Sequence, residues 1–163
     1  MELLQHIQEW VKGELAQAKI MITIGIIILV AIFYIYKSSN AIVNGTLIPV
    51  GLIIIALLGY GSFMFHDRNK RLSLIQKEYE QTSSISFDTE KTKIEEGIAS
   101  CKITIRVWYA LIVIGIGLFF FFTQPYYRGI GIGIALLGIT LLLVDVFIDK
   151  RAKILYDIYT RLE

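Results

Sequence analysis

Long apolar runs alternate with charged segments along the whole chain. Four of these runs contain no lysine or arginine, and they cover residues 20–36, 46–65, 107–123 and 129–148. Each run is close to the roughly 17–25 residues that a transmembrane helix needs. The pattern therefore predicts four membrane-spanning helices.

The charged segments next to these runs have helical periodicity. Near the N-terminus, Leu4, Ile7, Val11 and Leu15 fall on one helix face, and the later segments repeat similar three- and four-residue steps. The clear interruption is the polar stretch 82–86. We therefore expect each span to continue into a cytoplasmic helical segment, at residues 2–19, 66–82, 88–106 and 149–163.

The predicted fold class is all-α, an integral membrane four-helix bundle that forms a single domain over residues 1–163. Short outer connections at 37–40 and 124–128 join the spans into two hairpins. We expect the apolar stripes of the projecting segments to face one another and to close the cytoplasmic part of the bundle. An alternative for residues 1–18 is a helix that lies flat on the membrane surface.

The two hairpins resemble each other in layout. Each consists of a helix, a span, a short turn, a second span and a second helix, and the tetrapeptide Ala-Leu-Leu-Gly occurs at 56–59 and again at 135–138. This layout favours a parallel internal repeat of residues 1–82 and 88–163. The alternative is that two membrane hairpins share such a pattern through composition alone.

The distribution of charge predicts the orientation in the membrane. Of the 16 lysines and arginines, all except Lys37 and Arg128 lie on the side that holds both termini. Cytoplasmic loops of membrane proteins are enriched in basic residues, so both termini are expected in the cytoplasm. The expected location is a cell membrane, in particular a bacterial inner membrane, with the lipid bilayer as the first partner.

Composition excludes several kinds of site. Cys101 is the only cysteine, so neither an intrachain disulfide nor a multi-cysteine metal site is possible. The net charge of +2, without an arginine-rich patch, gives no reason to expect nucleic acid as a partner. No metalloprotease, phosphate-loop or Ser–His–Asp pattern occurs. We therefore expect a protein that is not an enzyme and needs no cofactor or metal.

Five residues are candidates for a helix interface or a gate. Gly131, Gly138 and Asp145 are spaced by sevens and share one helix face, where small residues allow close packing in lipid. Aligning the two Ala-Leu-Leu-Gly copies makes Gly59 equivalent to Gly138 and His66 equivalent to Asp145. A hydrogen-bonded Asp–His pair at that depth would sense protons or gate a pathway. The plainer alternatives are glycines that are simply common in spans, and two ionisable side chains that reach water.

These features favour a non-enzymatic membrane interaction protein that assembles through helix packing. A subunit of a membrane complex or an immunity-type partner binder would fit, with a protein partner or a second copy held by the bundle. The alternative is a homo-oligomeric channel or membrane-disrupting effector regulated by the cytoplasmic helices. A proton-coupled transporter is the weakest hypothesis, because no carboxylate lies near the middle of a span.

Overall fold

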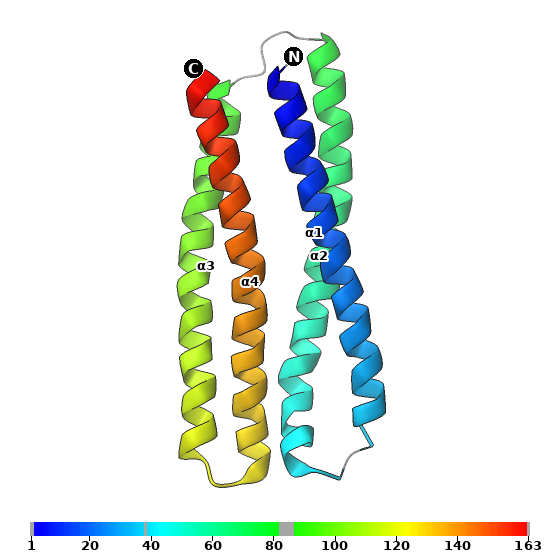
Figure 1. Ribbon diagram of the computed structural model, residues 1–163, viewed down its shortest axis with the longest axis vertical. Helices are drawn as coiled ribbons and strands as arrows, with labels where there is room; N and C mark the ends of the chain where they lie inside the picture. The colour runs from blue at the N-terminus through cyan, green and yellow to red at the C-terminus, as the bar shows by residue number, and fades with distance from the viewer. Residues whose placement is uncertain (1, 38, 82–86, 163) are drawn as a thin grey trace.

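The chain forms four long α-helices in the computed structural model, which describes residues 2–37, 39–81 and 87–162 (Figure 1). Side chains are described at residues 8–37, 39–68, 70, 92, 94–158 and 160. The helices are α1 (Glu2–Ile35), α2 (Ala41–Gln81), α3 (Phe87–Phe121) and α4 (Pro125–Leu162). No strand occurs in the described ranges, so the all-α prediction is confirmed.

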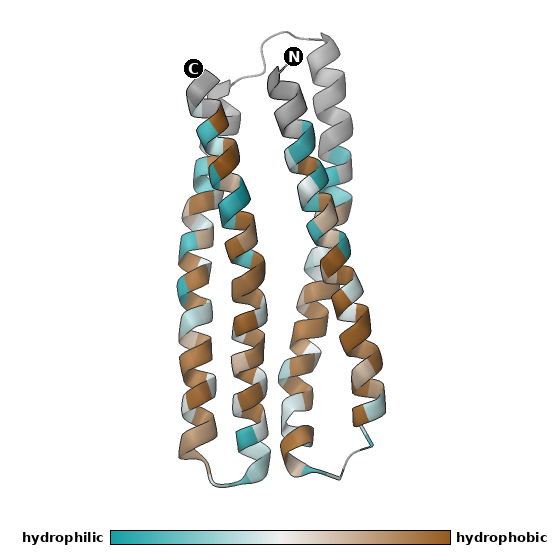
Figure 2. Cartoon of the chain, viewed as in Figure 1, coloured by the Kyte–Doolittle hydropathy of each residue, from teal (hydrophilic) through white to brown (hydrophobic). Residues whose placement is uncertain are grey.

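Each helix joins an apolar part to a polar part without a break, as the sequence predicts (Figure 2). All four are long and apolar enough to cross a membrane. Because α1 runs unbroken from Glu2 to Ile35, residues 2–18 do not form a separate helix across a membrane surface. The beginnings of α1 and α3 and the ends of α2 and α4 form what we call the polar half, and the remainder is the apolar half.

Local sequence explains where α2 and α4 begin. The Asn40 side-chain oxygen accepts a hydrogen bond from the Ile42 amide at 2.9 Å, which caps α2. Pro125 is the first residue of α4, a position where the missing amide proton of proline costs nothing. The predicted connection at 124–128 is therefore too long, since its last four residues already belong to α4.

The helices pack in the order α3, α4, α2 and α1, with a smaller contact between α1 and α4. Figure 1 shows α1 crossing α2, so that α1 lies outside α2 in the apolar half and between α2 and α4 in the polar half. Gln17 of α1 accordingly donates a hydrogen bond to the Val144 carbonyl of α4 at 3.3 Å. Helix α1 thus contacts α4 as well as α2, whereas α3 contacts α4 alone among the described residues.

Two buried apolar clusters hold this arrangement together. In the apolar half, Met21, Ile53 and Leu57 pack together, with partly buried side chains from α1, α2 and α4 around them. In the polar half, Val11 of α1 and Leu155 of α4 form a cluster, and the partly buried Trp10, Leu15 and Ile94 pack against it. The second cluster includes a residue of α3, so apolar side chains of three helices meet in the polar half.

Most apolar side chains in the apolar half lie on the outside of the molecule. Phe33 and Tyr34 near the end of α1 are each 84% exposed, and Phe121 at the end of α3 is 89% exposed. Water would penalise this much apolar surface, whereas lipid tails would not. The four candidate transmembrane helices therefore indicate a multi-pass membrane protein in contact with a bilayer.

Candidate functional site

The face of α4 that carries Gly131, Gly138 and Asp145 packs against α3 of the same chain. A Cβ atom added at Gly131 would lie 2.7 Å from the Gly115 carbonyl oxygen, and one at Gly138 would lie 2.7 Å from Ile112 Cγ1. On the same face, Asp145 Oδ2 accepts a hydrogen bond from Trp108 Nε1 at 2.6 Å. The structure thus places these three candidates at a close helix interface inside the chain.

A second pair of glycines brings α4 close to α2. Gly129 lies against the backbone of Ile42 and Gly45, so closely that a Cβ atom there would overlap the Ile42 carbonyl oxygen. One turn later, a Cβ atom at Gly133 would lie 2.8 Å from the ring of Pro49, which stands inside α2. The glycine-rich start of α4 therefore has two packing faces, one against α2 and the other against α3.

The remaining two candidates have different surroundings. Gly59 is exposed and has open space within 4 Å of the position that its Cβ atom would occupy. His66 is also exposed, and no hydrogen bond or ion pair joins it to Asp145, whose carboxylate is bonded to Trp108 instead. The structure therefore does not bring His66 and Asp145 together, and Gly59 and Gly138 are not packed alike.

Trp108→Phe is expected to destabilise the protein by about 1 kcal/mol, because Asp145 loses its indole donor while still half-buried. Unfolding in mild detergent, followed by circular dichroism, measures the change in free energy. His66→Ala is the control and should leave the unfolding free energy unchanged. Equal stability of the two variants would show that the bond between Trp108 and Asp145 contributes nothing.

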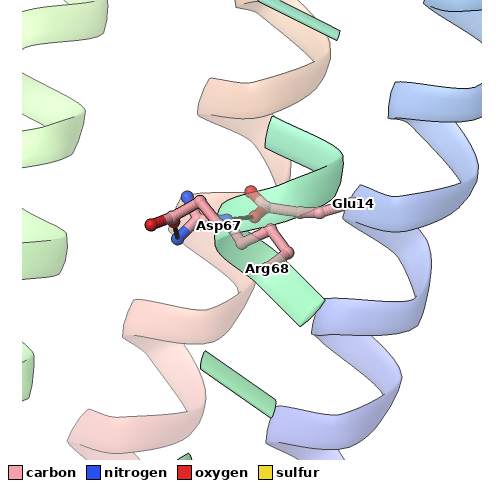
Figure 3. A network of polar contacts seen from close by, with 3 residues as sticks. All are labelled: Glu14, Asp67 and Arg68. Atoms are coloured by element: carbon pink, nitrogen blue, oxygen red, sulfur yellow. Dashed lines mark hydrogen bonds and ion pairs between the residues drawn. The ribbon is translucent and has the colours of Figure 1, made fainter. Parts of the chain in front are cut away.

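The most deeply buried charge in the described part of the chain is one that the sequence interpretation missed. The Glu14 side chain on α1 is only 2% exposed, and its Oε2 forms an ion pair with Nε of Arg68 on α2 (Figure 3). Arg68 Nη1 lies 3.3 Å from Asp67 Oδ2, and the guanidinium carbon lies 5.1 Å from the centre of the Trp10 ring. We call Trp10, Glu14, Asp67 and Arg68 the central polar cluster.

The central polar cluster borders a cavity of about 240 Å³ to which all four helices contribute. Glu14 and Arg68 line it together with Tyr60 of α2 and Cys101 of α3. The cavity is large enough for several water molecules, and its wall offers polar atoms to bind them. It is therefore the place in the fold where a buried ion pair borders an internal space.

Two further buried polar side chains, Asp149 and Gln17, form contacts with α4. Asp149 is 9% exposed and forms an ion pair with Lys153, one turn later on α4, at 2.5 Å. Buried Gln17 bridges from α1 to α4 through its hydrogen bond to Val144. No group of three His, Cys, Asp or Glu side chains suited to a metal ion occurs among the described residues. The arrangement can hold helices in register.

A pattern in the sequence marks the buried ion pair. Glu14 continues the apolar positions Val11, Ala18 and Met21 at three- and four-residue steps, and these four residues are buried. Arg68 likewise extends a four–three–four series on α2 that begins at residue 57. A charged residue at an apolar seam position in each of two neighbouring helices is therefore the signal that would have predicted the pair.

Comparison with known proteins found no relative of this chain. No protein-family model, curated protein or solved structure matches it. What the protein does is therefore inferred from its own residues and their arrangement.

Proposed function

We propose that the chain is a non-enzymatic, multi-pass membrane interaction protein, built as a four-helix bundle of two parallel hairpins. Its polar half would lie in the cytoplasm, with both termini there, and a bacterial inner membrane is the expected location. The four apolar helices and the gathering of polar residues at one end support this arrangement (Figure 2). So does the basic composition of the segments that make up that end.

The observation that carries the proposal is an open face on α2. Ile55, Gly59, Ser62, Phe63 and His66 lie on this face and are all exposed, and no other helix covers Gly59. In lipid, a small residue between larger ones lets the backbone of another helix approach closely. The open α2 face is thus a suitable docking site for a transmembrane helix of a protein partner or of a second copy.

The glycines of α4 favour this function over a channel. A channel lined by glycine at an oligomer axis would require Gly131 and Gly138 on the outside of the subunit, but both pack against α3 of the same chain. A homo-oligomeric channel or membrane-disrupting effector remains the second candidate. It is favoured by the cavity between the four helices, where Glu14 and Arg68 would line a regulated entrance.

Cysteine crosslinking in membranes tests the proposed function. In a Cys101→Ser background, Gly59→Cys is expected to give a crosslinked product with a bifunctional thiol reagent, because helices that pack at Gly59 approach closely. Gly117→Cys on α3 is the matched control, since that glycine also has open space around it. Mass analysis of the product distinguishes a second copy from another protein.

Ion flux separates the two candidate functions. The purified protein in liposomes is expected not to conduct ions, because the glycines of α4 pack against helices of the same subunit and not around an oligomer axis. Steady ion conduction, together with no crosslinking at Gly59, would contradict the interaction function and favour the channel.

A further inference from the structure

A groove of about 520 Å³ lies between α3 and α4 in the polar half, away from the central polar cluster. Its walls include Lys102 and Arg106 of α3 and Lys153 of α4. Apolar Ile103 and the aromatic ring of Tyr156 contribute to the same groove. Three basic residues beside apolar surface make this groove different from the cavity beside the central polar cluster.

The charges in the groove favour an anion. Lys102 and Arg106 are exposed, lie one turn apart, and form no hydrogen bond or ion pair with any described residue. Lys153 adds a third cation, although its ion pair with Asp149 at 2.5 Å partly neutralises it. Glu95 is the acidic residue of the lining, and it lies about two turns from Lys102 at the far end of the groove. The end beside Lys102 and Arg106 is therefore the positive one.

The depth of the groove matches the headgroup layer of a bilayer. Lys102 precedes the apolar run of α3 by five residues, and Lys153 follows that of α4 by five residues. At 1.5 Å per residue, both lie roughly 7.5 Å from the ends of those runs. The headgroup region on each side of a bilayer is roughly 5–8 Å thick. Both charges would thus lie near the level of the lipid phosphates.

An apolar path leads from the groove toward the membrane interior. Ile103 is 64% exposed, and Val107, one turn deeper on α3, is 48% exposed. Acyl chains attached to a headgroup in the groove would run along this surface, which a free inorganic anion does not need. The surface therefore favours an amphipathic anion over a soluble one.

We propose that this groove binds the headgroup of an anionic phospholipid, with Lys102 and Arg106 contacting its phosphate and Lys153 bordering it. Basic pockets between transmembrane helices recognise such headgroups by charge. The inference requires the membrane location but not a partner at the open α2 face, so either can fail without the other.

Native mass spectrometry in mild detergent tests the inference, with phosphatidylglycerol and zwitterionic phosphatidylcholine as the probes. Lys102→Gln/Arg106→Gln is expected to weaken phosphatidylglycerol binding roughly 30-fold, at about a factor of five for each basic side chain. Lys19→Gln/Lys150→Gln is the matched control, because both lysines are exposed near the ends of apolar runs and the charge change is equal. The control should bind much as the unaltered protein does.

Three results would overturn the inference. One is an equal loss of phosphatidylglycerol binding in both double variants, which would mean that the lipid is attracted by the overall charge of the protein and not by a specific site. Another is equal binding of phosphatidylcholine by the unaltered protein. The third is displacement of phosphatidylglycerol by inorganic phosphate at comparable concentration, which would identify a phosphate site. Lys102→Arg/Arg106→Lys retains the charges and is expected to retain binding, so a folding defect can be told from loss of the site.

Discussion

Arg68→Met is expected to destabilise the protein by about 3–5 kcal/mol, because the Glu14 carboxylate stays buried while its guanidinium partner is removed. Glu14 comes from α1 and Arg68 from α2, so the substitution weakens the contact between these two helices (Figure 3). Methionine keeps an apolar stem of similar length beside Trp10, which limits the loss of packing. Thermal unfolding in mild detergent measures the effect.

Lys12→Met is the control for Arg68→Met, because Lys12 is exposed and lies two residues from Glu14 on α1. It should change the unfolding free energy by less than about 0.5 kcal/mol. The double variant Glu14→Gln/Arg68→Met removes the buried charge as well and is expected to recover part of the stability. If Arg68→Met were as stable as Lys12→Met, the ion pair would have no structural role.

The helices themselves could be predicted because their cause is local. Apolar runs of sufficient length specify the spans, and the lack of glycine–proline breaks beside them lets each helix continue into its charged segment. The packing of α1 depends instead on its neighbours. Helical periodicity places Glu14 on the apolar face of α1, but only the crossing of α1 and α2 shows that Arg68 is the charge that faces it. The partner of such a charge can be named only when the facing helix is known.

The glycines show the same limit. The spacing of Gly131, Gly138 and Asp145 puts these residues on one face of the helix, whereas it does not say which helix covers that face. The same tetrapeptide also leads to different surroundings, since Gly59 is open and Gly138 meets α3. The reason is that α2 turns Leu57 and Gly61 toward its neighbours, which leaves residue 59 outside. A repeated sequence therefore gives two helices the same composition, but it does not determine which face each helix turns toward its neighbours.

Gly129→Ala is expected to destabilise the protein by about 3 kcal/mol, because the added methyl group would overlap the backbone of α2. The atoms in its way are the Ile42 carbonyl oxygen and the Gly45 Cα atom, and neither can rotate aside as a flexible side chain would. The α2–α4 contact joins the two hairpins in the apolar half. Relief of the overlap therefore requires the hairpins to separate there.

Gly51→Ala in α2 is the matched control, because a Cβ atom at Gly51 meets nothing within 4 Å. It should be neutral or slightly stabilising, since alanine favours the helix by up to about 1 kcal/mol over glycine. Spin labels at Ser39 and Gln124 report the distance between the two outer turns, and this distance should increase in Gly129→Ala alone. If Gly129→Ala kept this distance unchanged and were as stable as Gly51→Ala, backbone contact at Gly129 would not be what holds α2 and α4 together. The joint between the hairpins would then have to lie in the polar half, where α1 reaches α4 through Gln17 and Val11.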